Sequence, residues 1–181
     1  AVKAGESFRQ ISSKTSFSYG KWLAIGALII TLFVAFSGGF DNQFVDWDDH
    51  VYIENDYLVT EPKGHFGEAF KSHVALNYHP LTIVSMMINS SVSGADNPKA
   101  FIVTNFIIHL LNTLMVFWLL MLLTKRRLMV SFFAALLFAI HPMRVESVTW
   151  ISERKDVLYG FFFIAGCISY LYYLDSEKKN K

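Results

Sequence analysis

The sequence predicts an all-α integral membrane protein with about four transmembrane helices and a long folded loop on one side of the membrane. Hydrophobic residues make up 53% of the 181 residues, and they are concentrated in charge-free runs instead of being spread at amphipathic spacing. Charged and polar residues gather between those runs. This distribution excludes an ordinary soluble domain, because apolar runs of membrane length indicate transmembrane helices.

Three of the runs are long enough to cross a bilayer. They cover residues 22–40, 100–123 and 157–174 and contain 19, 24 and 18 residues, close to the roughly 20 that span about 30 Å of hydrocarbon. A fourth run, 128–140, has only 13 residues. Because spans flank it on both sides, we expect a short or interrupted membrane helix over 128–141. The first run exceeds the apolar core of about 7–15 residues in a signal peptide, so we expect it to be retained.

Basic residues divide unequally between the loops. With a cytoplasmic N-terminus, the cytoplasmic segments hold ten of the 16 Lys and Arg residues, and the outer segments hold six over a much longer stretch. An excess of Lys and Arg marks cytoplasmic loops. We therefore expect residues 1–21 to form a cytoplasmic basic tail, and 175–181 a second tail or the start of a missing C-terminal part. Loops 41–99 and 141–156 then share the non-cytoplasmic side.

The first outer loop is too long for a simple connector and carries a helical pattern. Leu81, Val84, Ile88 and Val92 recur every three or four residues, which is typical of an amphipathic helix lying in the membrane interface. Pro80 suits the first turn of such a helix.

The second span carries three polar residues on one helical face, Asn105, His109 and Asn112. Polar groups at membrane depth face protein or water. We favour hydrogen bonding between helices, with a proton relay or histidine ligand as the alternative.

Two charged clusters lie in the predicted outer loops. Asp46-Trp47-Asp48-Asp49 places three carboxylates within four residues, which can attract a cation, a base or a polar substrate, or can form a solvated acidic turn. The short third run ends at His141-Pro142, and charges of both signs follow it as far as Asp156. A membrane helix that stops early before dense charge is typical of a polar-ligand site, and arginine suits phosphate. The alternative is a solvated loop of mutually paired charges.

Three stretches occur in order along the predicted outer loops: Phe44–Asp49, Tyr78–Thr82 and His141–Val148 with Glu153–Asp156. Together they resemble the N-terminal membrane region of the tetratricopeptide-repeat-containing transmembrane O-mannosyltransferases and their bacterial relatives. That family has the C-type glycosyltransferase fold. The resemblance implies a transferase that moves a sugar, in this family mannose, from a polyprenyl-phosphate carrier to a hydroxyl acceptor, including protein acceptors, on the non-cytoplasmic side.

The resemblance also implies roles for individual residues. In this family an acidic residue in the first outer loop is catalytic, and that role would fall on Asp48 or Asp49. Such a carboxylate can act as general base toward the acceptor hydroxyl. Arg144 or Arg154 would stabilise the departing phosphate. The resemblance also implies that three residues contact the substrate and shape its site: His79, His141 and Glu146. Enzymes of this fold differ in metal use, so a divalent metal stays an open question and no metal ligand is predicted.

Full-length relatives have more spans and a soluble repeat region, so we expect this chain to be the front part of a longer protein and inactive alone. Two other functions stay open: a four-span accessory or scaffold subunit, and part of a transporter. Nucleic-acid binding is excluded because the basic residues are scattered over loops. The sequence does not separate a bacterial inner membrane from the endoplasmic reticulum, and of these two we favour the bacterial inner membrane.

Overall fold

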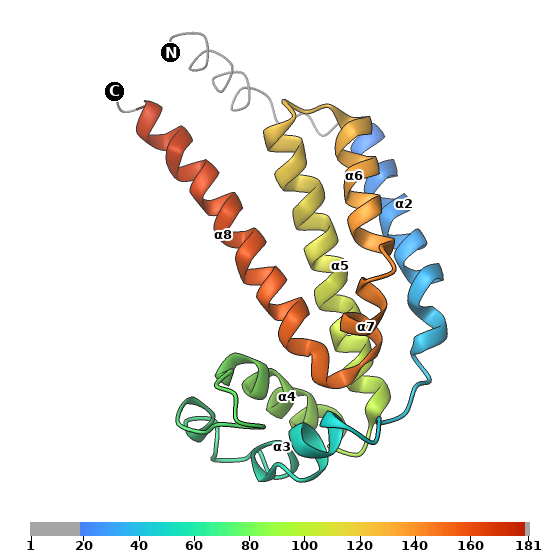
Figure 1. The fold of residues 1–181 in the computed structure, drawn as a ribbon. Coiled ribbons are helices and arrows are strands. Elements are labelled where there is room, and N and C mark those ends of the chain that lie inside the picture. The colour runs from blue at the N-terminus through green and yellow to red at the C-terminus, as the bar shows by residue number, and fades with distance from the viewer. Residues whose placement is uncertain (1–18, 180–181) are drawn as a thin grey trace. The chain divides into compact units, whose positions relative to one another are not determined.

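The computed structural model describes residues 19–179, which are mainly helical and form no β-strand. Most of the predicted cytoplasmic tail, residues 1–18, lies outside the described part. Short 3-10 or π turns separate several of the helices, which are drawn in Figure 1. The helices are α2 Tyr19–Phe36, α3 Tyr57–Thr60, α4 Pro80–Ser93, α5 Pro98–Leu123, α6 Leu128–Ile140, α7 Arg144–Thr149 and α8 Arg154–Lys179.

Within residues 19–179, three helical segments are long and apolar enough to cross a membrane. They are Tyr19–Gly39, Pro98–Leu123 and Ile151–Glu177, with 21, 26 and 27 residues. Helix α6 is apolar but has only 13 residues. The prediction of an all-α membrane protein is therefore confirmed. Helix α8 starts at Arg154, before the charge-free run, and continues to Lys179, so most of the predicted C-terminal tail is helical.

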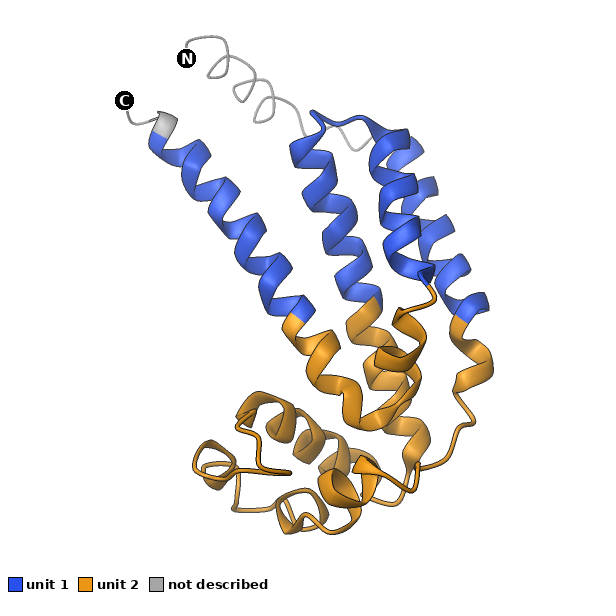
Figure 2. Ribbon diagram, viewed as in Figure 1, with its two compact units in different colours: residues 1–35, 110–141, 160–181 blue, residues 36–109, 142–159 orange. Residues whose placement is uncertain are grey.

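The chain divides into two compact units, which Figure 2 shows in different colours. Unit 1 takes in the described residues up to 35, residues 110–141 and those from 160 onward. Unit 2 consists of residues 36–109 and 142–159. Both α5 and α8 pass from one unit into the other. Unit 2 therefore contains the whole first outer loop and most of the second.

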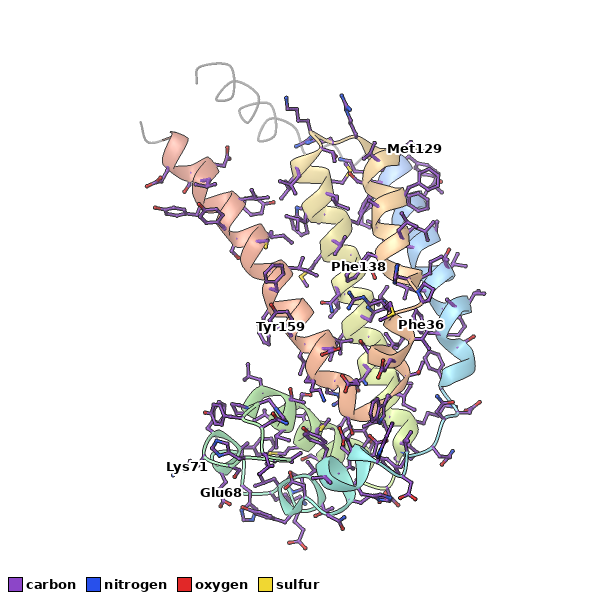
Figure 3. The ribbon with its side chains drawn as sticks, viewed as in Figure 1. Phe36, Glu68, Lys71, Met129, Phe138 and Tyr159 are labelled. Carbon is purple, nitrogen blue, oxygen red and sulfur yellow. The ribbon has the colours of Figure 1, made fainter. Side chains whose placement is uncertain are left out.

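Unit 1 is held together by apolar packing between α2, α5 and α6. Leu28 of α2, Phe117 and Met121 of α5 and Ala135 of α6 belong to one buried cluster. The small side chain at position 135 lets the helix backbones approach closely, as in other membrane helix pairs. The outer faces are also apolar: Met129 of α6, labelled in Figure 3, is 62% exposed. Apolar faces on both sides suit a helix surrounded by lipid.

Unit 2 has its own apolar core beneath the first outer loop. The predicted helix in this loop is α4, and it begins at Pro80 with His79 as its N-cap. Its inner side buries Met86 and Met87, whereas Leu81, Ile88 and Val92 are exposed. The stripe predicted from helical spacing is therefore mostly an outward face, and its location in the membrane interface stays a prediction. The core residues are Tyr52, Ile53, Leu58, Val59, Ala69, Val74, Ile83, Met86, Met87, Phe101, Ile102 and Ile151.

Candidate functional site

Asp49 is completely buried and fully hydrogen-bonded. One carboxylate oxygen accepts from the backbone N–H of Val45 at 2.9 Å, and the other accepts from the backbone N–H of Ser152 at 3.1 Å and from the Ser152 hydroxyl. These bonds join the first outer loop to the turn that precedes α8. A carboxylate held by three donors fixes the loop around it to the segment that contains Ser152.

Asp48 differs from its neighbour in both burial and bonding. Its side chain is half-buried, and no hydrogen bond to it is found among residues 19–179. Its charge acts on the ammonium group of Lys155. Lys155 Nζ also forms an ion pair with Glu153 Oε1 at 2.9 Å and lies 5.7 Å from the centroid of the Tyr52 ring. Asp48 is thus the carboxylate of this run that makes no hydrogen bond to residues 19–179 and whose charge reaches a cation.

His79 joins the same group of side chains through Tyr52. The two rings lie 5.3 Å apart between centroids, and the His79 Nε2 atom is buried without a hydrogen-bond partner. Burial, followed by the positive charge of Lys155, holds the pKa of His79 below its usual range. The imidazole is therefore neutral at pH 7, and Nε2 can bind a polar ligand atom. We call Asp48, Tyr52, His79, Glu153 and Lys155 the Asp48 group.

Arg154 lies at the centre of a different set of contacts. The guanidinium is 0% exposed and makes five hydrogen bonds, all to neutral groups. Its ring of partners comes from α4 and α5, and the Phe101 ring stacks beneath it at 5.4 Å. We call this set the Arg154 cluster. The partners are Asn105 Oδ1 at 2.8 Å, Asn89 Oδ1 at 2.6 Å, the Phe101 carbonyl at 2.8 Å, and the Ser85 carbonyl and hydroxyl at 3.1 and 3.3 Å.

The polar stripe of α5 is buried, as predicted. Asn105, His109 and Asn112 are 0%, 1% and 2% exposed. Asn105 links the stripe to the site, because its amide donates to the Trp150 carbonyl at 3.0 Å while its oxygen accepts from Arg154. The favoured interpretation, hydrogen bonding between helices, is confirmed for this residue by its bond to Arg154 at the start of α8.

The other predicted site residues occupy separate places. Arg144 begins α7 and is half-buried, and Glu146 in the same helix is exposed. His141 is the exposed C-cap of α6 and falls in unit 1. These placements do not test the predicted substrate contacts of the three residues, which stay predictions.

Sequence reasoning missed several side chains around the acidic run. His50 lies between the carboxylates of Glu54 and Asp46, and hydrogen bonds first to Glu54 and then to Asp46 raise its pKa. Trp47 is 73% exposed and stacks on Trp150 at 6.0 Å. The spacing of residues 46, 50 and 54 at i, i+4 and i+8 was a usable signal for the first of these contacts.

The part of the chain that the structure describes contains no candidate metal site. Among residues 19–179, no group of three or more His, Cys, Asp or Glu side chains is arranged to hold a metal ion. The acidic run contributes hydrogen-bond acceptors and negative charge. Asp49 accepts hydrogen bonds from the protein, whereas the half-buried Asp48 accepts none from residues 19–179.

Comparison with known proteins gives relatives of one kind. Protein O-mannosyl-transferase TMTC4 of Homo sapiens is 32% identical over 168 residues, which cover 82% of this chain and 22% of the relative. The chain is a relative of the TMTC protein O-mannosyl-transferases. TMTC1 of Mus musculus is 35% identical over 99 residues, and TMTC3 of Mus musculus 32% over 94, covering 55% and 52% of the chain and 10% of each relative.

The resemblance inferred from the outer-loop stretches is thereby confirmed. The chain spans about a fifth of the length of TMTC4 and a tenth of TMTC1 and TMTC3. No family model and no solved structure matches the chain.

Proposed function

We propose that this chain carries the catalytic loop of a membrane glycosyltransferase that moves mannose from a polyprenyl-phosphate carrier to a hydroxyl group of a protein. One observation carries the proposal: in a relative of protein O-mannosyl-transferases, Asp48 is a half-buried carboxylate with no hydrogen-bond partner among residues 19–179, and its charge is felt by the Lys155 ammonium group. Such a group suits proton transfer in a partly dry site.

In the proposed reaction, Asp48 takes the proton of the acceptor hydroxyl. The acceptor oxygen then forms a bond to the anomeric carbon of the sugar, and the bond between that carbon and the carrier phosphate oxygen breaks. The phosphate leaves with the electron pair. Asp49 is less suited to this work because it is buried and its oxygens already accept three hydrogen bonds from the protein. We therefore assign the base role, left open between Asp48 and Asp49 by the sequence, to Asp48, and a positioning role to Asp49.

The remaining predicted contacts fit around this reaction in different ways. His79 offers a neutral imidazole whose Nε2 has no protein partner, so we assign it a hydrogen bond to the donor. Arg144, Glu146 and His141 keep their proposed substrate contacts. Arg154 was predicted to bind phosphate, but its N–H groups already donate to protein atoms, so we assign it to holding α4, α5 and the start of α8 together.

We also propose the orientation that the basic residues indicate. The N-terminus lies in the cytoplasm, and the Asp48 group lies on the non-cytoplasmic side, where the chain meets the lipid-linked donor and a protein acceptor. The bacterial inner membrane as location stays a prediction, since the relatives compared are human and mouse proteins. The need for a divalent metal stays open.

The test uses the full chain that contains these residues, in membranes, with polyprenyl-phosphate-linked mannose and an acceptor peptide rich in serine and threonine. Asp48→Asn should lower the transfer rate by about 10² to 10⁴-fold, the usual contribution of a general base. Asp41→Asn is the matched control, because Asp41 is exposed in the same loop. Wild-type transfer by the Asp48 variant would rule out this base and leave an accessory or transport role.

A further inference from the structure

We propose that Lys155, and not its neighbour Arg154, is the cation that binds the phosphate of the lipid-linked donor. This inference rests on the proposed function and names the group that recognises the leaving half of its substrate. It departs from the preference for arginine at phosphate sites, because the two adjacent cations have very different surroundings in unit 2.

The first step of the argument is availability. The Lys155 side chain is 34% exposed, whereas Arg154 is 0% exposed. An ammonium group has three N–H donors, and the ion pair with Glu153 at 2.9 Å occupies one of them. The five hydrogen bonds of Arg154 engage its Nε and both terminal nitrogens. A phosphate can therefore bind Lys155 without breaking hydrogen bonds within the protein. To bind Arg154, it would have to replace buried hydrogen bonds that Arg154 makes to protein oxygens.

The second step is charge. The hydrogen-bond acceptors around Arg154 are all neutral oxygens, and within residues 19–179 Arg154 forms no ion pair with a carboxylate whose charge could change during the reaction. Two carboxylates act on Lys155: Glu153 forms an ion pair with it, and Asp48 attracts it more weakly without a direct contact. The Tyr52 ring, 5.7 Å from Lys155 Nζ, restricts the ammonium position through a cation–π contact. Lys155 is thus held in place but only partly neutralised.

The third step follows the charges through the transfer. When Asp48 accepts the proton of the acceptor hydroxyl, it becomes neutral and stops attracting Lys155. At the same moment the carrier changes from a phosphodiester with one negative charge to a phosphomonoester with two. The attraction between Lys155 and the phosphate therefore grows toward the transition state. An interaction that is stronger in the transition state than in the ground state accelerates the reaction.

His79 adds an independent pointer to a ligand at this place. Its Nε2 atom is buried and unpartnered, and the ring lies against the same Tyr52 that borders Lys155. A buried polar atom without a partner is destabilising unless a ligand or water satisfies it. One phosphate or sugar oxygen near Lys155 would satisfy it.

The experiment measures donor use and carrier binding separately, on the full chain in detergent or lipid. We expect Lys155→Met to lower kcat/KM for polyprenyl-phosphate-linked mannose by about 10² to 10³-fold, the usual loss for one group that stabilises a developing anion. We also expect it to weaken binding of sugar-free polyprenyl monophosphate at least tenfold. Lys155→Arg should restore most of that binding. Lys99→Met is the matched control, since Lys99 pairs with Asp41 on the exposed surface.

The folded fraction of Arg154→Lys should bind polyprenyl monophosphate like the wild type, because Lys155 is unchanged. Wild-type carrier binding by Lys155→Met would overturn the inference, and so would loss of binding confined to Arg154→Lys. Since carrier binding is measured without transfer, it also separates the two proposals. Lys155-dependent binding in a chain whose Asp48→Asn variant still transfers sugar would support the phosphate site and reject the proposed base.

Discussion

The Arg154 cluster and the Asp48 group belong to the same unit, and peptide bonds join Arg154 to both Glu153 and Lys155, yet the two sets have opposite properties. In the Arg154 cluster, the cation is fully buried and its donor nitrogens are all engaged. In the Asp48 group, one carboxylate and one imidazole nitrogen have no hydrogen-bond partner among residues 19–179. A saturated network stabilises the fold, whereas unsaturated groups at a partly open place are available to a ligand.

The largest expected effect comes from removing the buried cation. Arg154→Met removes the donor to the side-chain oxygens of Asn89 and Asn105, so we expect a loss of about 3–5 kcal/mol in the free energy of unfolding. Lys155→Met should change it by less than about 1 kcal/mol, as for other partly exposed ion pairs. Thermal unfolding in detergent micelles compares the two. Equal losses of stability in the two variants would contradict the distinction between the Arg154 cluster and the Asp48 group.

The second effect contrasts the two adjacent aspartates. Asp49→Asn turns one acceptor oxygen into an N–H₂ group that faces the Val45 or Ser152 donors, and should reduce stability by about 1–3 kcal/mol. Asp48→Asn should stay within about 0.5 kcal/mol of wild type while it loses transfer activity. The measurement is the unfolding midpoint of both variants under one condition. A destabilised Asp48 variant with an unaffected Asp49 variant would reverse the roles assigned to them.

The smallest expected effect is a difference in pKa between His50 and His79. Glu54 and then Asp46 raise the pKa of His50 above its usual 6.5, while burial and then Lys155 lower that of His79. NMR titration of the imidazole protons should therefore show His79 losing its proton at lower pH than His50. Lys155→Met should move the His79 pKa upward without moving that of His50. An unchanged His79 titration in that variant would remove Lys155 from the surroundings of His79.

The signs for stability follow from linkage. The pKa of His79 is lower in the folded protein than in the unfolded chain. As the pH falls through 6.5, the unfolded chain therefore binds a proton at His79 before the folded protein does, and the free energy of unfolding decreases. The folded-state pKa of His50 is raised, so its contribution is present below 6.5 and is lost as the pH rises through the folded value. The two residues thus oppose each other around neutral pH.

Some of this organisation could be predicted from the sequence, because it depends on local patterns. The long apolar runs predicted the spans, His79-Pro80 predicted the start of α4, and the spacing of the polar residues in α5 predicted a buried face. The difference in burial and bonding between Asp48 and Asp49 could not be predicted, because it depends on Ser152, which is 103 positions away from Asp49. Likewise Arg154 and Lys155 look equally basic in sequence, and only the partners supplied by α4 and α5 separate them.

The bond between Asp49 and Ser152 also has a consequence for biosynthesis. A ribosome adds about 5–20 residues per second, so the 103 residues between the two partners take roughly 5 to 20 s to synthesise. During that interval Asp49 has the nearby Val45 N–H as a partner but lacks both donors of Ser152. The loop therefore acquires its final form only when the segment before the last described helix has emerged, so Asp49 is fixed in place late, after most of this membrane region has been made.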